Sequence, residues 1–182
     1  MQAVVVYWSK TGNTEQVART IERTLHAEGA DVTCYRIEEA ADLDWFAYDL
    51  ICLGFPPYSW APPKPVDNWL KEKFAAYRAQ DRVKTGSPEI PGKYVLIFCT
   101  YSGPHTGIDE AIPPVKYAGQ FFAHLGLKVV DEWYIIGEYH GSLERSTEGR
   151  LGDIRGRPSE QDLAQVAEDT RALLDRLQLI SA

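Results

Sequence analysis

Apolar and polar residues follow strand patterns in five separate stretches of the chain. Residues 3–8, 50–54 and 94–99 are continuous apolar runs, and residues 31–37 alternate between apolar and polar. Residues 127–136 supply a last strand. Continuous runs are typical of central parallel strands covered on both faces, whereas alternation indicates a partly exposed strand. The pattern therefore predicts five strands.

Between these stretches the apolar residues recur at helical spacing. We expect helices after residue 14, at about 64–78, near 110–125 and after Pro158-Ser159. Strands interleaved with helices imply an α/β fold, namely a doubly wound five-stranded parallel sheet with helices on both faces. With 182 residues the chain is long enough for a sizeable core, and we expect residues 1–182 to form one domain.

The turn between the first strand and the first helix is rich in hydrogen-bond donors. It consists of Ser9, Lys10, Thr11, Gly12, Asn13 and Thr14. Backbone amides and the helix dipole converge at such a position, so the turn predicts an anion site, most simply for a phosphate. The alternative is a hydroxyl-rich helix cap that binds nothing.

The same turn limits the kind of phosphate ligand. It lacks the three-glycine dinucleotide fingerprint and the Gly-Lys-Ser/Thr ending of nucleotide triphosphatase loops. Lys10 is its one positive side chain, and no acid beside it could hold Mg²⁺. A single terminal phosphate, without a metal, suits this donor set best.

Two further loops follow the strands at 50–54 and 94–99. In doubly wound sheets a ligand binds outside the carboxyl ends of the strands. The relevant residues are Pro56, Pro57, Tyr58 and Trp60 in the second loop, and Thr100, Tyr101, Ser102 and Gly103 in the third. Prolines stiffen the second loop and leave Tyr58 and Trp60 displayed, while Tyr101 is expected to project from the third. These aromatics beside a phosphate site predict a flat ring.

These segments resemble flavodoxins. The resemblance is carried by residues 9–14, the strand and loop at 48–56, and the loop at 100–103, and it extends to Gly156-Arg157-Pro158 before the last helix. It implies the strand order 2-1-3-4-5 and noncovalent FMN as cofactor. The turn would hold the FMN phosphate. The other two loops would hold the isoalloxazine, with Tyr58, Trp60 or Tyr101 against its faces.

Two functions remain open on this scaffold. The first is a flavodoxin-like redox protein that transfers electrons between cytoplasmic partners docking at the flavin edge, which needs no catalytic residue. The alternative is an FMN-dependent NAD(P)H or quinone reductase. In that enzyme arginines of residues 137–158 could meet an NADPH phosphate, and His105 or His140 could donate protons. A phosphate-accepting receiver module is excluded because the strand ends lack clustered aspartates.

The second loop also bears on how electrons leave. Between Phe55 and Lys64 it contains four prolines and no glycine. A peptide in this loop should therefore turn over less easily than in single-electron flavodoxins, because proline fixes φ and has no N–H. We expect the one-electron-reduced flavin to be less stabilised here.

Charge and cysteine content narrow the setting. A net charge of −7 argues against nucleic-acid and anionic-membrane binding. No apolar run is long enough to span a bilayer, and no basic region precedes the first strand. The dispersed Cys34, Cys52 and Cys99 fit a reducing compartment, and Cys99 is expected to be a core residue. We expect a cytoplasmic protein.

Overall fold

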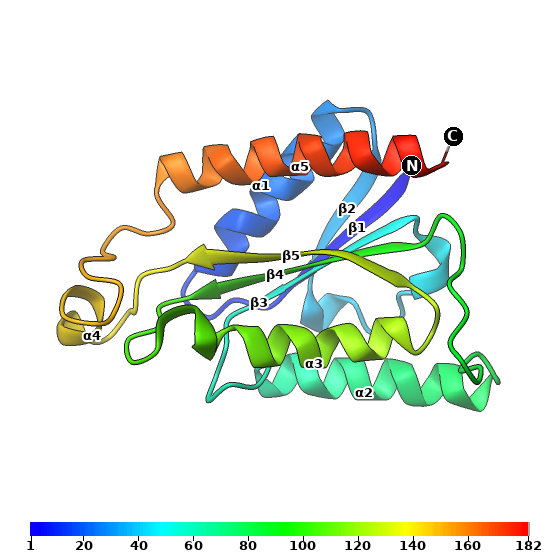
Figure 1. Ribbon diagram of the computed structural model, residues 1–182, viewed down its shortest axis with the longest axis horizontal. Helices are drawn as coiled ribbons and strands as arrows, with labels where there is room; N and C mark the ends of the chain where they lie inside the picture. The colour runs from blue at the N-terminus through cyan, green and yellow to red at the C-terminus, as the bar shows by residue number, and fades with distance from the viewer. Residues whose placement is uncertain (182) are drawn as a thin grey trace.

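The sheet has the predicted order. A computed structural model describes the backbone of residues 1–181 and the side chains of residues 1–177. Its five parallel strands are ordered β2-β1-β3-β4-β5 (Figure 1). Their bounds are β1 Gln2–Tyr7, β2 Asp31–Arg36, β3 Leu50–Phe55, β4 Tyr94–Tyr101 and β5 Lys128–Ile136.

Helices cover both faces of the sheet. Figure 1 shows α1 (Asn13–Ala27) and α5 (Glu160–Ser181) on one face, and α2 (Lys64–Ala79) and α3 (Ile112–Ala123) on the other. All four agree with the predicted helices to within a few residues. Among the described residues none of the helices is both long and apolar enough to span a bilayer.

The apolar pattern did not predict the short helical turns. The predicted long loop after β5 contains α4 (Leu143–Thr147), which lies beyond the carboxyl ends of β4 and β5 (Figure 1). Three 3₁₀ turns, at Ile37–Glu39, Trp45–Ala47 and Gly107–Glu110, connect other elements. A single turn is too short to show a helical period.

Burial follows the position of each strand in the sheet. Every residue of β3 and β4 is buried, whereas β2 and β5 at the two edges are largely half-exposed. The continuous apolar runs thus mark central strands, as expected. In addition, β4 continues two residues beyond the predicted 94–99.

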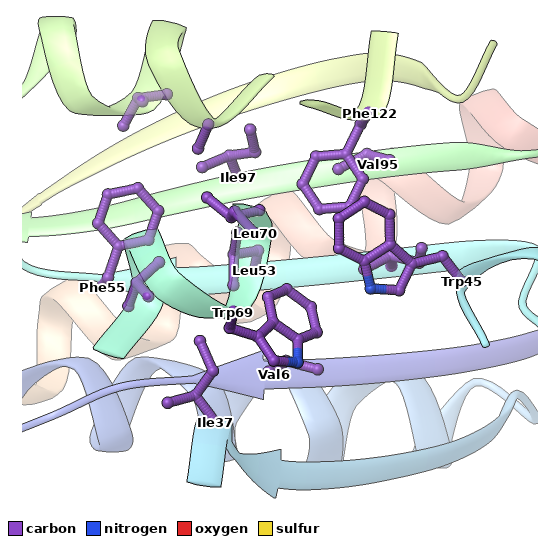
Figure 2. Close-up of a cluster of buried hydrophobic side chains, with 14 of the residues drawn as sticks. Val6, Ile37, Trp45, Leu53, Phe55, Trp69, Leu70, Val95, Ile97 and Phe122 are labelled. Carbon is purple, nitrogen blue, oxygen red and sulfur yellow. The ribbon is translucent and has the colours of Figure 1, made fainter. Parts of the chain in front are cut away.

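The core consists of two clusters, one on each face of the sheet. Beneath α2 and α3, the Trp45 ring lies 4.4 Å from the Phe122 ring and 5.1 Å from the Trp69 ring, measured between centroids (Figure 2). On the other face, Tyr7 and Phe98 pack with residues of α1 and α5. Helices therefore pack against both faces of the sheet.

Candidate functional site

A cavity of about 370 Å³ opens beyond the carboxyl ends of β1, β3 and β4. It is lined by residues from all three predicted loops. Those predicted from sequence are Ser9, Lys10, Thr11, Asn13, Thr14, Pro56, Pro57, Tyr58, Thr100, Ser102 and Gly103. The fold thus brings together segments almost a hundred residues apart, because parallel strands end on the same edge.

The turn before α1 is held open by contacts around Ser9. Gly12, at φ 99°, donates its N–H to Ser9 Oγ at 3.1 Å, and Arg36 donates to the Ser9 carbonyl at 2.9 Å. The positive φ suits glycine, which has no Cβ. No described residue accepts the N–H groups of Lys10 or Thr11. The turn therefore presents free donors to the cavity.

The first turn of α1 adds to this donor set. The first helical hydrogen bond runs from the Gln16 N–H to the Gly12 carbonyl at 3.0 Å. The N–H groups of Asn13 and Thr14 precede it and have no intrahelical acceptor, as at every helix N-terminus. These amides and the positive end of the helix dipole favour an anion.

Two buried hydroxyls form the floor between the first and third loops. Thr14 Oγ1 and Thr100 Oγ1 lie 2.7 Å apart, and both side chains are almost fully buried. The two groups carry two protons, and the hydrogen bond between them uses one. One O–H therefore remains for a ligand in the cavity.

The Asn13 side chain also makes hydrogen bonds within the protein. Its Nδ2 donates to the Glu138 carbonyl at 2.9 Å, and its Oδ1 lies 3.1 Å from His140 Nε2. Because an amide oxygen only accepts, the imidazole Nε2 carries the proton. The Asn13 side chain thus fastens the segment after β5 to the turn.

The second loop is folded into a tight hairpin. Tyr58 and Ala61 exchange two backbone hydrogen bonds, of 2.9 and 3.0 Å, around Ser59 at φ 49° and Trp60 at φ 61°. Two consecutive positive φ values define a turn that favours Gly or Asn. The Tyr58 ring meets the Trp8 ring edge-on at 5.5 Å. The loop is thus braced, and it lines the cavity through Tyr58.

The other two predicted aromatics lie elsewhere. Trp60 is 66% exposed and is not one of the residues that line the cavity. The expectation that Tyr101 projects from the third loop is wrong: it is the last residue of β4 and is 7% exposed in the core. Because β4 continues two residues beyond the predicted end, Tyr101 belongs to the strand, and its side chain lies on the same face as that of Cys99. Gly12 belongs to the turn but does not line the cavity.

The third loop requires a glycine. Gly103, at φ 46°, lies so close to Gly107 that a Cβ would come within 2.4 Å of the Gly107 carbonyl oxygen. The chain therefore folds back tightly beside the cavity. Ser102 Oγ donates to the Gly137 carbonyl at 2.7 Å, which joins this loop to the segment after β5.

One wall of the cavity was not predicted as part of the FMN site, although His140 in it was a candidate proton donor. Additional lining residues are Pro104, Glu110, Glu138, Tyr139 and His140. Three of these directly follow Gly137, at the start of the glycine- and arginine-rich stretch of 137–158. The unusual length of that stretch was the available signal, since long loops in compact domains are often functional.

Cys99 and His105 do not line the cavity. Burial raises the pKa of the Cys99 thiol well above its ordinary value, and the side chain is fully buried. Cys99 is therefore a core residue, as expected. His105 does not line the cavity, and its backbone N–H is fixed by Glu110 at 2.8 Å.

The donor set fits a phosphate monoester joined to a flat ring. Free amides and hydroxyls gather at the α1 end, and Lys10 is a lysine on the turn with no ion-pair partner among the described residues. Tyr58 and the prolines supply an apolar surface at the other end. Such a split between polar and apolar walls is what FMN requires.

Comparison with known proteins finds similarity to flavodoxins. Residues 5–79 match the family model described as flavodoxin. A flavodoxin from Megasphaera elsdenii is 35% identical over 97 residues, which are 53% of this chain and 63% of that protein. The aligned region therefore spans less than two thirds of this relative.

Solved structures extend the likeness to the whole sheet. Flavodoxin 2 from Bacillus cereus superposes with a TM-score of 0.67 at 18% identity, covering 97% of this chain and 99% of that one. A flavodoxin from the domain Archaea gives a TM-score of 0.65 at 17% identity, with 98% and 99% covered. The strand order and these matches show that the chain has the fold of flavodoxins.

Proposed function

We propose that the protein binds FMN noncovalently and transfers electrons between cytoplasmic partners. FMN is the cofactor of the flavodoxin family to which residues 5–79 match. The observation that carries the proposal is the free donor set at the start of α1 opposite the apolar wall of Tyr58. We treat residues 1–182 as one FMN-binding domain.

Some residues of the cavity would bind the FMN phosphate, and others would cover the flavin ring. Ser9, Thr11 and the Thr14–Thr100 pair donate to the phosphate, and Lys10 adds positive charge nearby. Tyr58 covers the ring, and the braced hairpin keeps it in place. Bound FMN supplies the reversible redox chemistry, so the protein needs no acid–base residue of its own.

A redox partner would approach the open mouth of the cavity. Trp60 and Tyr58, 66% and 46% exposed, offer apolar surface for a transient contact there. The net charge of −7 favours partners with a basic docking face. Cys34, Cys52 and Cys99 are all free, which suits the reducing cytoplasm.

Three of the four arginines of residues 137–158 already make contacts within the protein, which gives little support to the reductase alternative. Arg155 pairs with Asp153, Arg157 pairs with Asp162, and the Arg145 guanidinium lies over the Tyr139 ring. A phosphate of NADPH would have to displace these contacts. The electron carrier is therefore the preferred function.

Reconstitution tests the proposal directly. Apoprotein mixed with FMN should give a yellow complex that survives gel filtration and releases FMN on denaturation. It should then accept electrons from a low-potential dye and turn over NADPH with a quinone only slowly. A protein that cannot be loaded with FMN would overturn the proposal, and rapid NAD(P)H oxidation would favour the reductase.

A further inference from the structure

The wall of the cavity formed after β5 contains a second tyrosine. Of the aromatics predicted to face the ring, only Tyr58 lines the cavity, since Trp60 lies outside it and Tyr101 is buried. Tyr139 lines the same cavity. Tyr58 and Tyr139 are therefore two tyrosines, from segments far apart in the sequence, that line one cavity.

The backbone around Tyr139 is fastened on both sides. Asn13 holds the carbonyl of Glu138 at 2.9 Å and the imidazole of His140 at 3.1 Å. Gly137 lies so close to Asn13 that a Cβ would come within 2.7 Å of Asn13 Nδ2. These contacts between the turn of residues 9–14 and residues 137–140 thus fix the position of the Tyr139 backbone.

The side chain of Tyr139 is held from α4. Arg145 donates to the Tyr139 hydroxyl, and its guanidinium carbon lies 4.8 Å from the ring centroid. Ser146, which is 2% exposed, donates through Oγ to the Tyr139 carbonyl at 2.9 Å. A guanidinium over an aromatic ring is an attractive contact that restrains the ring's rotation. Tyr139 is therefore oriented before any ligand binds.

We propose that Tyr139 contacts the isoalloxazine ring across the cavity from Tyr58, and that Arg145 is the positioning residue that orients it. The inference rests on the proposed function, because it takes FMN as the ligand. It assigns the second aromatic contact to the segment after β5 instead of the loop after β4. Asn13 also binds this segment to the turn of residues 9–14. The residues proposed to contact the ring are therefore connected by hydrogen bonds to those proposed to contact the phosphate.

Equilibrium titration of apoprotein with FMN tests this assignment, read by the fluorescence that FMN loses when an aromatic side chain stacks on it. Tyr139→Ala should raise the Kd about 10-fold and restore part of the emission of bound FMN. Tyr139→Leu removes the aromatic ring but keeps an apolar side chain of substantial volume, which limits disruption of the fold. It should restore the emission of bound FMN similarly. Tyr139→Phe keeps the ring and should show a smaller change.

Arg145→Gln isolates the positioning role. The Tyr139 ring remains, but its orientation is released, so the Kd should rise about 2–3-fold and the visible circular dichroism of bound FMN should change. Arg145→Lys should recover part of the signal because it retains the positive charge. An effect limited to thermal stability would contradict positioning.

Two controls separate this inference from the proposed function. Tyr117→Ala removes an exposed tyrosine of α3 outside the cavity and should leave Kd and emission unchanged. Ser9→Ala with Thr11→Val alters only the phosphate end. If this pair weakens FMN while both Tyr139→Ala and Tyr139→Leu change neither Kd nor emission, the role of Tyr139 is refuted. If the unaltered protein binds no FMN, the proposed function fails first.

Discussion

The buried pair Thr14–Thr100 connects folding and ligand binding through two hydroxyl groups 2.7 Å apart. Thr14→Val leaves the Thr100 hydroxyl buried without its partner, which costs about 1–3 kcal/mol of unfolding free energy. Replacing both with Val removes both polar groups and should cost less than the single change. Urea denaturation of the apoproteins measures this difference.

FMN affinity should follow a different order in the same variants. Thr14→Val still has the Thr100 O–H, which is then free for the ligand, whereas the double variant has neither hydroxyl, so the double variant should bind FMN more weakly than the single one. Thr24→Val is a matched control, because this buried threonine of α1 donates to the Thr20 carbonyl at 2.8 Å outside the cavity. It should lose stability without losing affinity, and an equal loss of affinity would place the phosphate elsewhere.

At this scale the sequence predicted donors better than aromatics. The turn at 9–14 is local, so its residues reach the cavity wherever the first strand and helix form. Tyr101 and Tyr139 depend on more distant facts: where β4 ends, and how residues 137–158 return over the sheet. Tyr101 is buried because β4 ends two residues later than predicted. The position of Tyr139 depends in part on the hydrogen bond from Asn13 to the neighbouring Glu138 carbonyl.

Packing between β3 and β4 depends on Gly54. A Cβ at this position would lie 2.0 Å from two ring carbons of Phe98, which is fully buried. Gly54→Ala should therefore lower the unfolding free energy by about 3 kcal/mol, because an overpacked core must shift its backbone. Denaturant titration with and without Phe98→Leu checks the cause, since the smaller side chain should recover part of the loss.

Gly119 of α3 provides a contrast with Gly54. A Cβ there would meet only ordinary contacts at 3.7 Å, and the backbone is helical. Gly119→Ala should be neutral or stabilise the protein by up to about 1 kcal/mol, from helix propensity. Equal losses at both positions would mean that the clash with Phe98 is not the cause.

The N-terminus of α5 makes stability depend on pH. Ser159 Oγ accepts the Asp162 N–H at 3.2 Å, and Asp162 Oδ2 accepts the Ser159 N–H at 2.6 Å. Burial raises the pKa of Asp162, but hydrogen bonds from Arg157 and Ser159 outweigh it and lower the pKa below the ordinary 3.8. The unfolded chain therefore binds the proton more readily than the folded one.

This carboxylate should stabilise the fold above pH 3.8, with the benefit lost as pH falls through the lowered pKa. Melting temperatures of the unaltered protein and Asp162→Asn, measured from pH 6 to pH 2, should differ most at the upper end and converge at the lower. A constant difference would mean that the charge of Asp162 does not contribute.

For the molecule as a whole, the sequence predicted the sheet and the helices that cover it, but not the conformation of the long loop at residues 137–158. Buried parallel strands read as apolar runs, and the surrounding helices carry a periodic apolar face, so topology followed from 50–54, 94–99 and their neighbours. The segment 137–158 has neither signal. Its conformation depends on long-range contacts such as Arg150 N–H to the Pro104 carbonyl at 3.0 Å, which no local pattern encodes.

The two core clusters lie on the faces of the sheet and are complete without a ligand, so the apoprotein should fold and FMN should add stability by mass action. At a free concentration of 100 times Kd the gain is about 2.7 kcal/mol. Melting temperature measured against FMN concentration should rise accordingly. Riboflavin has the same ring but no phosphate, and it should raise the melting temperature much less, because the donors of residues 9–14 then have no anion to bind. Equal shifts with the two ligands would rule out the phosphate site at this turn, whereas no shift with either would exclude flavin binding.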